Sequence, residues 1–292
     1  MNILTYDIEE WYAEETLYGD RKEKYAEYDQ YLDRILDILD KNQTKATFFC
    51  VGGLAPKYDH VIKRIAERGH EIGCHSDQHH FLNKMTYEGV LKDTRTAIDS
   101  IEQLIGKKVQ SYRAPAFSIG ESNKWAFDIL TECGIERDAS VFPAARDFGG
   151  FANFGADRPC LISHNGHTLK EFPICMASLF GREVAYSGGG YFRFFPLWFI
   201  KSQIKKSDYA MTYFHIGDLL PESKSVMTRK EYEDYFKEKG SLMNRYKRFV
   251  KANLGKKGAF NKMSKLVEQT SFINLAAADA QIDWNSAPHI TL

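Results

Sequence analysis

Short apolar segments alternate with longer amphipathic segments along most of this 292-residue chain, and this order restricts the fold to an α/β arrangement. Strands separated by helices pair in parallel and place the helices outside the sheet. No linker-like stretch interrupts the series, so the sequence predicts one α/β domain over residues 1–292, built as a distorted (β/α)7-type barrel. The strands are expected at residues 3–6, 45–51, 70–76, 109–117, 136–142, 168–174 and 209–216.

The amphipathic segments between these strands carry apolar residues every three or four positions, which is typical of helices packed on a sheet. Helices are expected at residues 25–42, 58–68, 86–105 and 125–133, and glycines follow the last three as stop signals. The barrel core is expected to span about residues 2–220. A charged helical extension follows over about residues 221–292, with one more apolar strand expected at residues 271–278.

Composition excludes some classes of partner and favours one compartment. Lys+Arg and Asp+Glu balance at 39 each, which gives no basic signature for nucleic acid. The five cysteines stand singly without CxxC spacing, as in proteins of a reducing compartment. The N-terminus shows no signal peptide, and no apolar run approaches the ~18–20 residues of a membrane span. We therefore expect a cytoplasmic protein without a transmembrane segment. The sequence does not indicate an oligomeric state.

Polar residues stand at the ends of several predicted strands, which is where a parallel barrel gathers its chemistry. They are Asp7, Glu9, His75, His79, Arg113, His215 and Asp218.

The two histidines and a carboxylate among these residues suggest a metal site. Asp7 and Glu9 are two apart on an extended chain and therefore share a face. Histidines four residues apart, as in the His75–His79 pair, converge on one face of a helical turn. Two histidines and a carboxylate would leave open positions on a divalent ion for water and substrate. Each element alone also has an ordinary explanation, as a surface pair, a helix cap or a buried histidine.

Five segments in order resemble the motifs of the polysaccharide deacetylases with NodB homology, carbohydrate esterase family four. The segments are TYDIEEW, RGHEIGCHSDQHH, SYRAPAFS, DASVFP and TYFHIGD. LKEFPI and GGGYFRFFP make the chain more similar to the branch found in exopolysaccharide and surface-glycan loci. The resemblance covers about residues 2–220. It implies a distorted barrel that hydrolyses N-acetyl groups on amino sugars with one bound divalent metal, often zinc.

The same resemblance implies roles for single residues. It makes Asp7 the general base, Arg113 the partner of that base, and His215 the general acid. It makes His75 and His79 metal ligands.

One position departs from the family pattern. Most members place a second Asp, the third ligand, where this chain has Ile8, which cannot bind a metal. By strand alternation Glu9 is the expected substitute. Asp138 is the candidate for tuning His215.

The expected substrate is an amino-sugar glycan or an activated precursor linked to a nucleotide or a lipid. Trp11, Phe117 and Tyr191 are candidate substrate-binding residues, although packing is an alternative role for such rings. The turn at residues 116–117 is expected to offer a backbone N–H to the oxyanion. Two other functions stay open: a metal-independent hydrolase of cyclic amides or ureides on the same barrel, and an inactive glycan-binding module.

Overall fold

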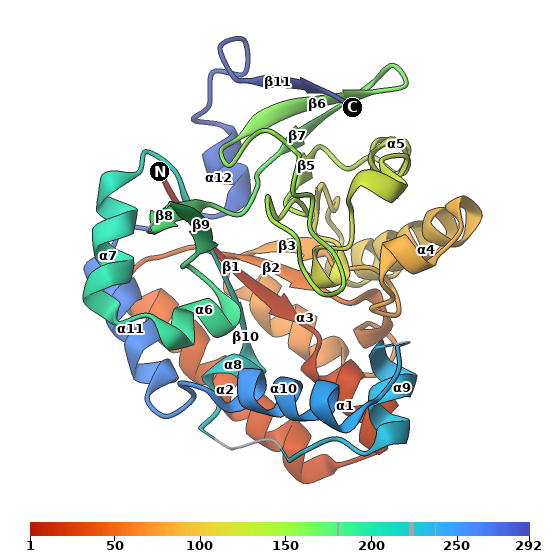
Figure 1. The fold of residues 1–292 in the computed structure, drawn as a ribbon, viewed down its shortest axis with the longest axis vertical. Coiled ribbons are helices and arrows are strands. Elements are labelled where there is room, and N and C mark those ends of the chain that lie inside the picture. The colour runs from red at the N-terminus through yellow and green to blue at the C-terminus, as the bar shows by residue number, and fades with distance from the viewer. Residues whose placement is uncertain (180, 222–224, 237) are drawn as a thin grey trace.

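The computed structural model describes residues 1–179, 181–221, 225–236 and 238–292. At its centre lie seven parallel strands surrounded by helices (Figure 1). Each corresponds to one of the seven strands expected from the sequence, so the α/β prediction is confirmed. Their order in the sheet is β10 (Ala210–His215), β1 (Asn2–Ile8), β2 (Thr47–Cys50), β3 (Glu71–Cys74), β4 (Ser111–Tyr112), β5 (Arg137–Asp138) and β7 (His167–Glu171).

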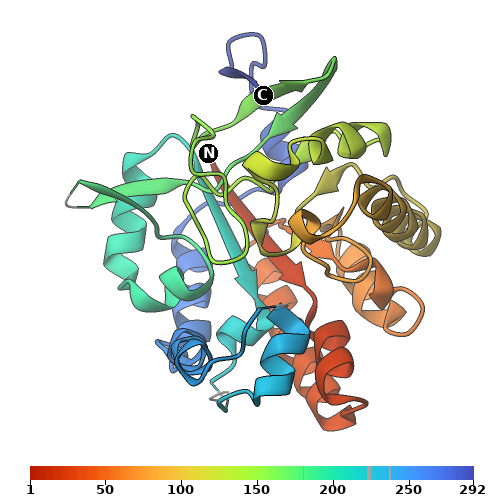
Figure 2. The same cartoon turned by 45° about the vertical axis from the view of Figure 1, so that its right-hand side comes forward.

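The strand sequences match their buried positions. All four residues of β2 and six of the seven in β1 are buried, as expected for parallel strands covered on both faces. The predicted helices are α2 (Lys22–Lys41), α3 (Asp59–Glu67), α4 (Tyr87–Ile105) and α5 (Ala126–Glu132). They lie along one flank of the sheet (Figure 2).

Helix α4 shows how local sequence sets the boundaries of these elements. The Thr86 hydroxyl accepts a hydrogen bond from the Gly89 N–H at its first turn. At its other end Gly106 takes the left-handed conformation with φ 66°. That conformation suits glycine and ends the helix.

The barrel is not closed by a continuous ladder, because no strand pairing joins β7 to β10 among the described residues. The chain leaves β7 through Pro173, which has no N–H to donate. Single contacts bridge the gap instead: the Met211 N–H donates to Cys175 Sγ, and the Ser187 hydroxyl donates to the Met211 carbonyl. The prediction of a distorted barrel therefore holds, with the distortion at this seam.

Several short strands have no counterpart in the sequence prediction. Strand β6 (Cys160–His164) pairs antiparallel with β7, and β11 (His289–Thr291) extends the sheet beyond β6. Strands β8 (Met176–Leu179) and β9 (Arg182–Ala185) form a separate hairpin beside the seam.

The C-terminal extension is mainly helical, as expected, but residues 271–278 do not form the predicted strand. Only Ile273 pairs, in a single bridge with Ile3. The Asn274 side chain then caps a helix by accepting from the Ala277 N–H, and the following alanines favour that helix. The helices of the extension are α9 (Arg229–Phe236), α10 (Leu242–Asn253), α11 (Ala259–Gln269) and α12 (Leu275–Asp279).

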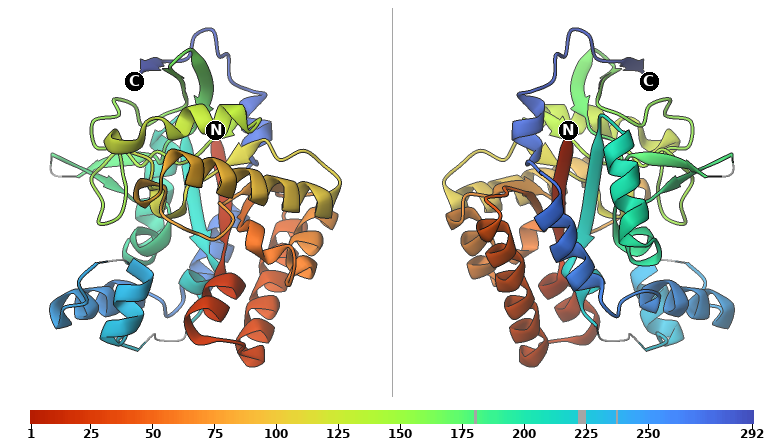
Figure 3. Two further views of the ribbon diagram at one scale, coloured as in Figure 1. Left: turned by 90° about the vertical axis from the view of Figure 1, so that its right-hand side faces the viewer. Right: turned by 90° about the vertical axis from the view of Figure 1, so that its left-hand side faces the viewer.

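These helices lie at both ends of the barrel. At the end where the strands begin, Thr47 Oγ1 and Glu71 Oε2 accept hydrogen bonds from the first N–H groups of α12. Helices α9 and α10, light blue in Figure 3, stand where the β1 and β10 arrows end. Because the extension completes the barrel at both ends, we propose that residues 1–292 form one folding unit. None of the helices within the described ranges has the length and apolar character needed to cross a bilayer.

His70 should make stability depend on pH. This buried histidine accepts a hydrogen bond from the Ala46 N–H at Nδ1, and burial lowers its pKa to about 4. The unfolded chain, with a histidine pKa near ~6.5, therefore takes up the proton first as pH falls. The stabilisation is fully present above pH ~6.5 and is lost towards pH ~4, up to about 3 kcal/mol. Urea unfolding from pH 7.5 to 4.5 should show this slope. It should be absent in His70→Asn and kept in a variant of the exposed His80, His80→Asn; an unchanged slope in His70→Asn would assign it elsewhere.

Candidate active site

The three predicted metal ligands lie close together where β1 and β3 end. Glu9 follows β1, His75 follows β3, and His79 lies in the turn after it. Glu9 Oε2 is 2.5 Å from His79 Nε2 and 3.7 Å from His75 Nε2. One ligand atom from each residue lies within 4.8 Å of the others. Glu9, two residues after Asp7, therefore supplies the carboxylate beside the two histidines that Ile8 cannot supply.

The chemistry of these three groups fits a divalent cation. His75 Nδ1 lies 2.7 Å from the Arg113 carbonyl and must carry the proton there, so that in the neutral ring Nε2 has a free lone pair directed at Glu9. Glu9 Oε2 is buried, and the polar atoms beside it are the Nε2 atoms of His79 and His75. Burial raises the pKa of Glu9, but the charges of His79 and His215 outweigh it and hold that pKa well below its usual range. An ionised carboxylate and two imidazoles facing one point form a donor set that zinc prefers.

The turn that carries the two histidines is not the helical turn expected from the sequence. Ser76 and His79 have left-handed backbones, with φ 63° and 55°. Such conformations are uncommon outside glycine and persist only where neighbours impose them. Here the Ser76 hydroxyl accepts from the His79 N–H, and the Asp93 carboxylate accepts from the N–H groups of Asp77 and Gln78.

Asp7 forms a buried ion pair with Arg113. Arg113 Nη1 donates to Asp7 Oδ1 at 2.8 Å and to the Thr5 hydroxyl at 2.7 Å. Both charged residues are at most 2% exposed. A buried carboxylate needs such compensation, and the pairing predicted from the sequence is present. Asp7 Oδ2 faces the other way, 3.7 Å from His215 Nε2.

His215 ends β10, and a different carboxylate from the predicted one holds it. Its Nδ1 lies 2.9 Å from Asp218 Oδ2, one helical turn further along the chain. Burial lowers the pKa of His215, but the charges of Glu9, Asp218 and Asp7 raise it to about 10. A cation in the site would offset these carboxylates and moderate that rise.

Asp138 does not contact His215, which corrects the sequence prediction. Its Oδ1 accepts a hydrogen bond from the Ser140 hydroxyl, which in turn accepts from the Ala114 N–H. Burial raises the pKa of Asp138 and of the neighbouring Glu171. The Asp138 and Glu171 carboxyls therefore lie at the ends of β5 and β7 and do not hold His215.

The candidate substrate-binding rings differ in exposure. Trp11 is fully buried against Tyr28, with ring centroids 5.5 Å apart, so its ring is core and offers no surface to a sugar. Phe117 is 4% exposed and packs edge-on against Tyr213, which likewise corrects its assignment as a binding ring. Tyr191 is 39% exposed and remains available.

Two residues near the site were missed by sequence reasoning. Glu10 is buried, and its Oε1 accepts from the Gly217 N–H. Burial, together with the charge of Glu9, raises its pKa to about 7. Arg193 in α6 (Gly189–Phe194) lies 3.4 Å from Asp218. The spacing of Asp218 after His215 could have been recognised as a helical turn, but no local pattern marks Arg193.

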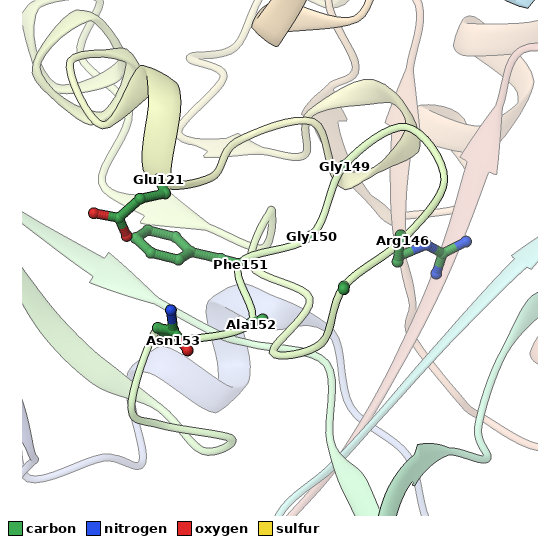
Figure 4. Close-up of a pocket in the computed structure, with 8 residues that line it drawn as sticks. Glu121, Arg146, Gly149, Gly150, Phe151, Ala152 and Asn153 are labelled. Carbon is green, nitrogen blue, oxygen red and sulfur yellow. The ribbon is translucent and has the colours of Figure 1, made fainter.

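A cavity of about 230 Å³ lies beside the loop at residues 145–153, and no predicted site residue lines it. In Figure 4 the side chain of Arg146 points away from Glu121, Phe151 and Asn153. Its guanidinium lies over the rings of Phe142 and Phe117 instead. The loop therefore packs against the residue 116–117 turn without taking part in the ligand cluster.

A seven-stranded parallel barrel with a Glu-His-His cluster and a buried Asp–Arg pair at its strand ends has the organisation of a NodB-type hydrolase fold. Residues 19–137 match the family model for polysaccharide deacetylase, and residues 139–278 match a domain of unknown function (DUF3473). The chain therefore carries a polysaccharide deacetylase domain over residues 19–137.

Among curated proteins, the uncharacterized protein YlxY of Bacillus subtilis is 37% identical over 103 residues, 35% of this chain and 31% of that protein. A peptidoglycan-N-acetylglucosamine deacetylase of Bacillus cereus is 34% identical over 33% of this chain and 36% of its own length. The chain thus spans about a third of these relatives. A structure from Mycobacterium smegmatis, assigned provisionally to the polysaccharide deacetylases, aligns over 100% of this chain and 92% of its own with a TM-score of 0.61. At 17% identity it shows the fold.

The site draws on both matched segments. His75, His79 and Arg113 lie in the first, His215 lies in the second, and Asp7 and Glu9 precede both. The boundary between the segments falls within β5.

Proposed function

We propose that this chain is a metal-dependent hydrolase that removes an N-acetyl or similar N-acyl group from an amino sugar. The observation that carries the proposal is the Glu9-His75-His79 cluster beside the buried Asp7–Arg113 pair and His215. The match to the polysaccharide deacetylase model supports the class of substrate.

Glu9, His75 and His79 would hold one divalent ion, which we take to be zinc from the donor set. Such an ion supplies Lewis acidity to an acyl oxygen and lowers the pKa of water. Asp7 is the general base, because its Oδ2 faces His215 while Arg113 fixes its other oxygen. Arg113 therefore positions the base.

The remaining steps need a donor to the oxyanion and a donor to the leaving nitrogen. The Phe117 N–H already bonds the Ala114 carbonyl, whereas the Ala116 N–H has no acceptor in the described part of the chain. Ala116 has φ 53°, an uncommon backbone conformation outside glycine, and its N–H is our candidate donor to the oxyanion. His215, held by Asp218, gives its Nε2 proton to the departing amine.

The substrate we propose belongs to surface-glycan synthesis, as a polymer or an activated precursor. Of the three candidate rings, Tyr191 is the exposed one, and we assign it to stack on a sugar. A cytoplasmic site of action is part of the proposal. It is supported by the five free cysteines, of which Cys50 and Cys74 face each other on paired strands without a disulfide.

Metal-free hydrolysis of a cyclic amide or ureide is the competing function. It gives no use to the three ligand atoms of Glu9, His75 and His79, which lie within 4.8 Å of one another. A glycan-binding module without activity would need neither Asp7 nor His215. Zinc-reconstituted protein should be tested for acetate release from nucleotide-linked, lipid-linked and polymeric N-acetyl amino sugars. Release from none of them, with full metal content, would overturn the proposal.

His215→Ala should slow the release of an amine more than the release of an activated phenolate. An amine must be protonated before it departs from an amide, whereas an activated phenolate leaves without a proton. We expect the variant to lose ~10²–10⁴-fold in kcat on an N-acetyl sugar and far less on an aryl acetate. Both rates should be measured with wild type as control. An equal loss on both substrates would give His215 a binding role instead.

A further inference from the structure

Arg193 occupies an unusual position for a charged side chain, at the junction of the barrel with the C-terminal extension. It is 6% exposed. Its Nη1 and Nη2 donate to the carbonyls of Ala252 and Lys251, at 2.6 and 2.9 Å. These carbonyls belong to the last turn of α10, where a helix leaves its acceptors unpaired and carries partial negative charge. Two of the guanidinium's three nitrogens are therefore fixed by α10.

The third nitrogen of the guanidinium, Nε, lies beside Asp218. Arg193 Nε makes no hydrogen bond among the described residues but lies within ion-pair distance of Asp218 Oδ1, at 3.4 Å, while Asp218 Oδ2 lies 2.9 Å from His215 Nδ1. The carboxylate thus stands between the guanidinium and the imidazole. This geometry directs His215 Nε2 towards Asp7 at 3.7 Å and Glu9 at 4.0 Å.

The backbone that carries Arg193 is held by the same extension. Lys262 Nζ donates to the carbonyls of Phe192, Arg193 and Phe195. Gly255 has φ +73°, and a Cβ there would stand 2.4 Å from the Arg193 carbonyl. Segment 251–262 therefore fits closely around α6 and leaves Arg193 little freedom to move.

We propose that Arg193 is a positioning residue: anchored by α10, it holds Asp218 and so sets the direction in which His215 presents its proton. The C-terminal extension then takes part in catalysis without touching the substrate. The inference rests on the proposed function of His215. The ordinary alternative is that Arg193 only fastens α6 to α10.

Arg193→Met keeps much of the side-chain volume and removes the charge, and Arg137→Met is the matched control. Arg137 is also a buried arginine, but it pairs with Asp279 on α12 at the opposite end of the barrel. Zinc content, urea unfolding, kcat and KM should be measured for both. We expect Arg193→Met to retain zinc and KM, with kcat on an N-acetyl sugar falling at least ~10-fold more than on an aryl acetate. Arg137→Met should lose stability with the ratio of the two rates unchanged.

A second measurement needs no substrate. In zinc-loaded wild type, the His215 Nδ1 proton facing Asp218 should give a slowly exchanging resonance, assigned by its loss in His215→Ala. It should disappear in Arg193→Met and persist in Arg137→Met. If wild type releases no acetate, the proposed function fails while this resonance still tests the positioning role.

Equal losses of kcat on the amide and the ester, or an unchanged His215 resonance in Arg193→Met, would show that Arg193 only fastens α6 to α10. Should Arg193→Met not fold, Arg193→Gln replaces it under the same criteria, because Gln retains a donor for the α10 carbonyls without the charge. In a double-mutant cycle, Arg193→Met should add no further change of ratio to Asp218→Asn. An additive effect would contradict action through Asp218.

Discussion

Replacing His75 and His79 together by alanine is expected to abolish divalent metal binding and all turnover on N-acetyl sugars. A single carboxylate, Glu9, cannot hold the ion alone at a site built from three converging ligand atoms. Elemental analysis after dialysis should find about one zinc per wild-type chain and none per variant.

His80→Ala is the control for this experiment, since His80 adjoins His79 but is exposed. It should retain both metal and activity. Undiminished zinc in the double variant would place the metal elsewhere, and undiminished turnover without zinc would favour the metal-free hydrolase.

Asp7→Asn should lower kcat by ~10²–10⁴ while leaving zinc bound. The amide keeps the shape of the carboxylate but cannot accept a proton from water. Because Asp7 is not one of the three clustered ligands, the metal content should match that of wild type. Parallel loss of metal and activity would make Asp7 a ligand and contradict this division of roles.

This variant also leaves the Arg113 charge without its buried partner, which typically costs about 3–5 kcal/mol of folding stability. Rates must therefore be measured well below the unfolding transition. Asp128→Asn is a suitable control, since Asp128 is a buried carboxylate that pairs with His164 away from the site. It should lower stability without the loss in kcat.

The parallel strands could be predicted because each is a short apolar run, and burial on both faces leaves little ambiguity in such runs. Asp7, Glu9 and His75 could be placed together because parallel strands end at one edge of the sheet. The proposed ligand role of Glu9 rests on the alternation of side chains along an extended chain, and the structure places Glu9 beside His75 and His79.

Features that depend on distant packing could not be predicted in the same way. The turn from Ser76 to His79 relies on Asp93 from α4, and the burial of Trp11 relies on Tyr28 from α2. The contact of Arg193 with Asp218 requires α10 to arrive from more than fifty residues away. Helix and strand propensities and hydrophobic periodicity are local properties, so they do not indicate which distant segments come into contact.

The boundary between the two matched segments cuts through β5, and this limits how the protein could be divided or fused. Ser111 and Tyr112 of β4 pair with Arg137 and Asp138, so a gene ending there would code for an uncovered sheet edge. Its product would carry His75, His79 and Arg113 without His215, the proposed acid. The complementary half would carry His215 without the proposed metal ligands. On the proposed roles, residues 19–137 alone would not catalyse the reaction, and a gene fusion intended to move it into another protein would have to include β1 and His215 as well.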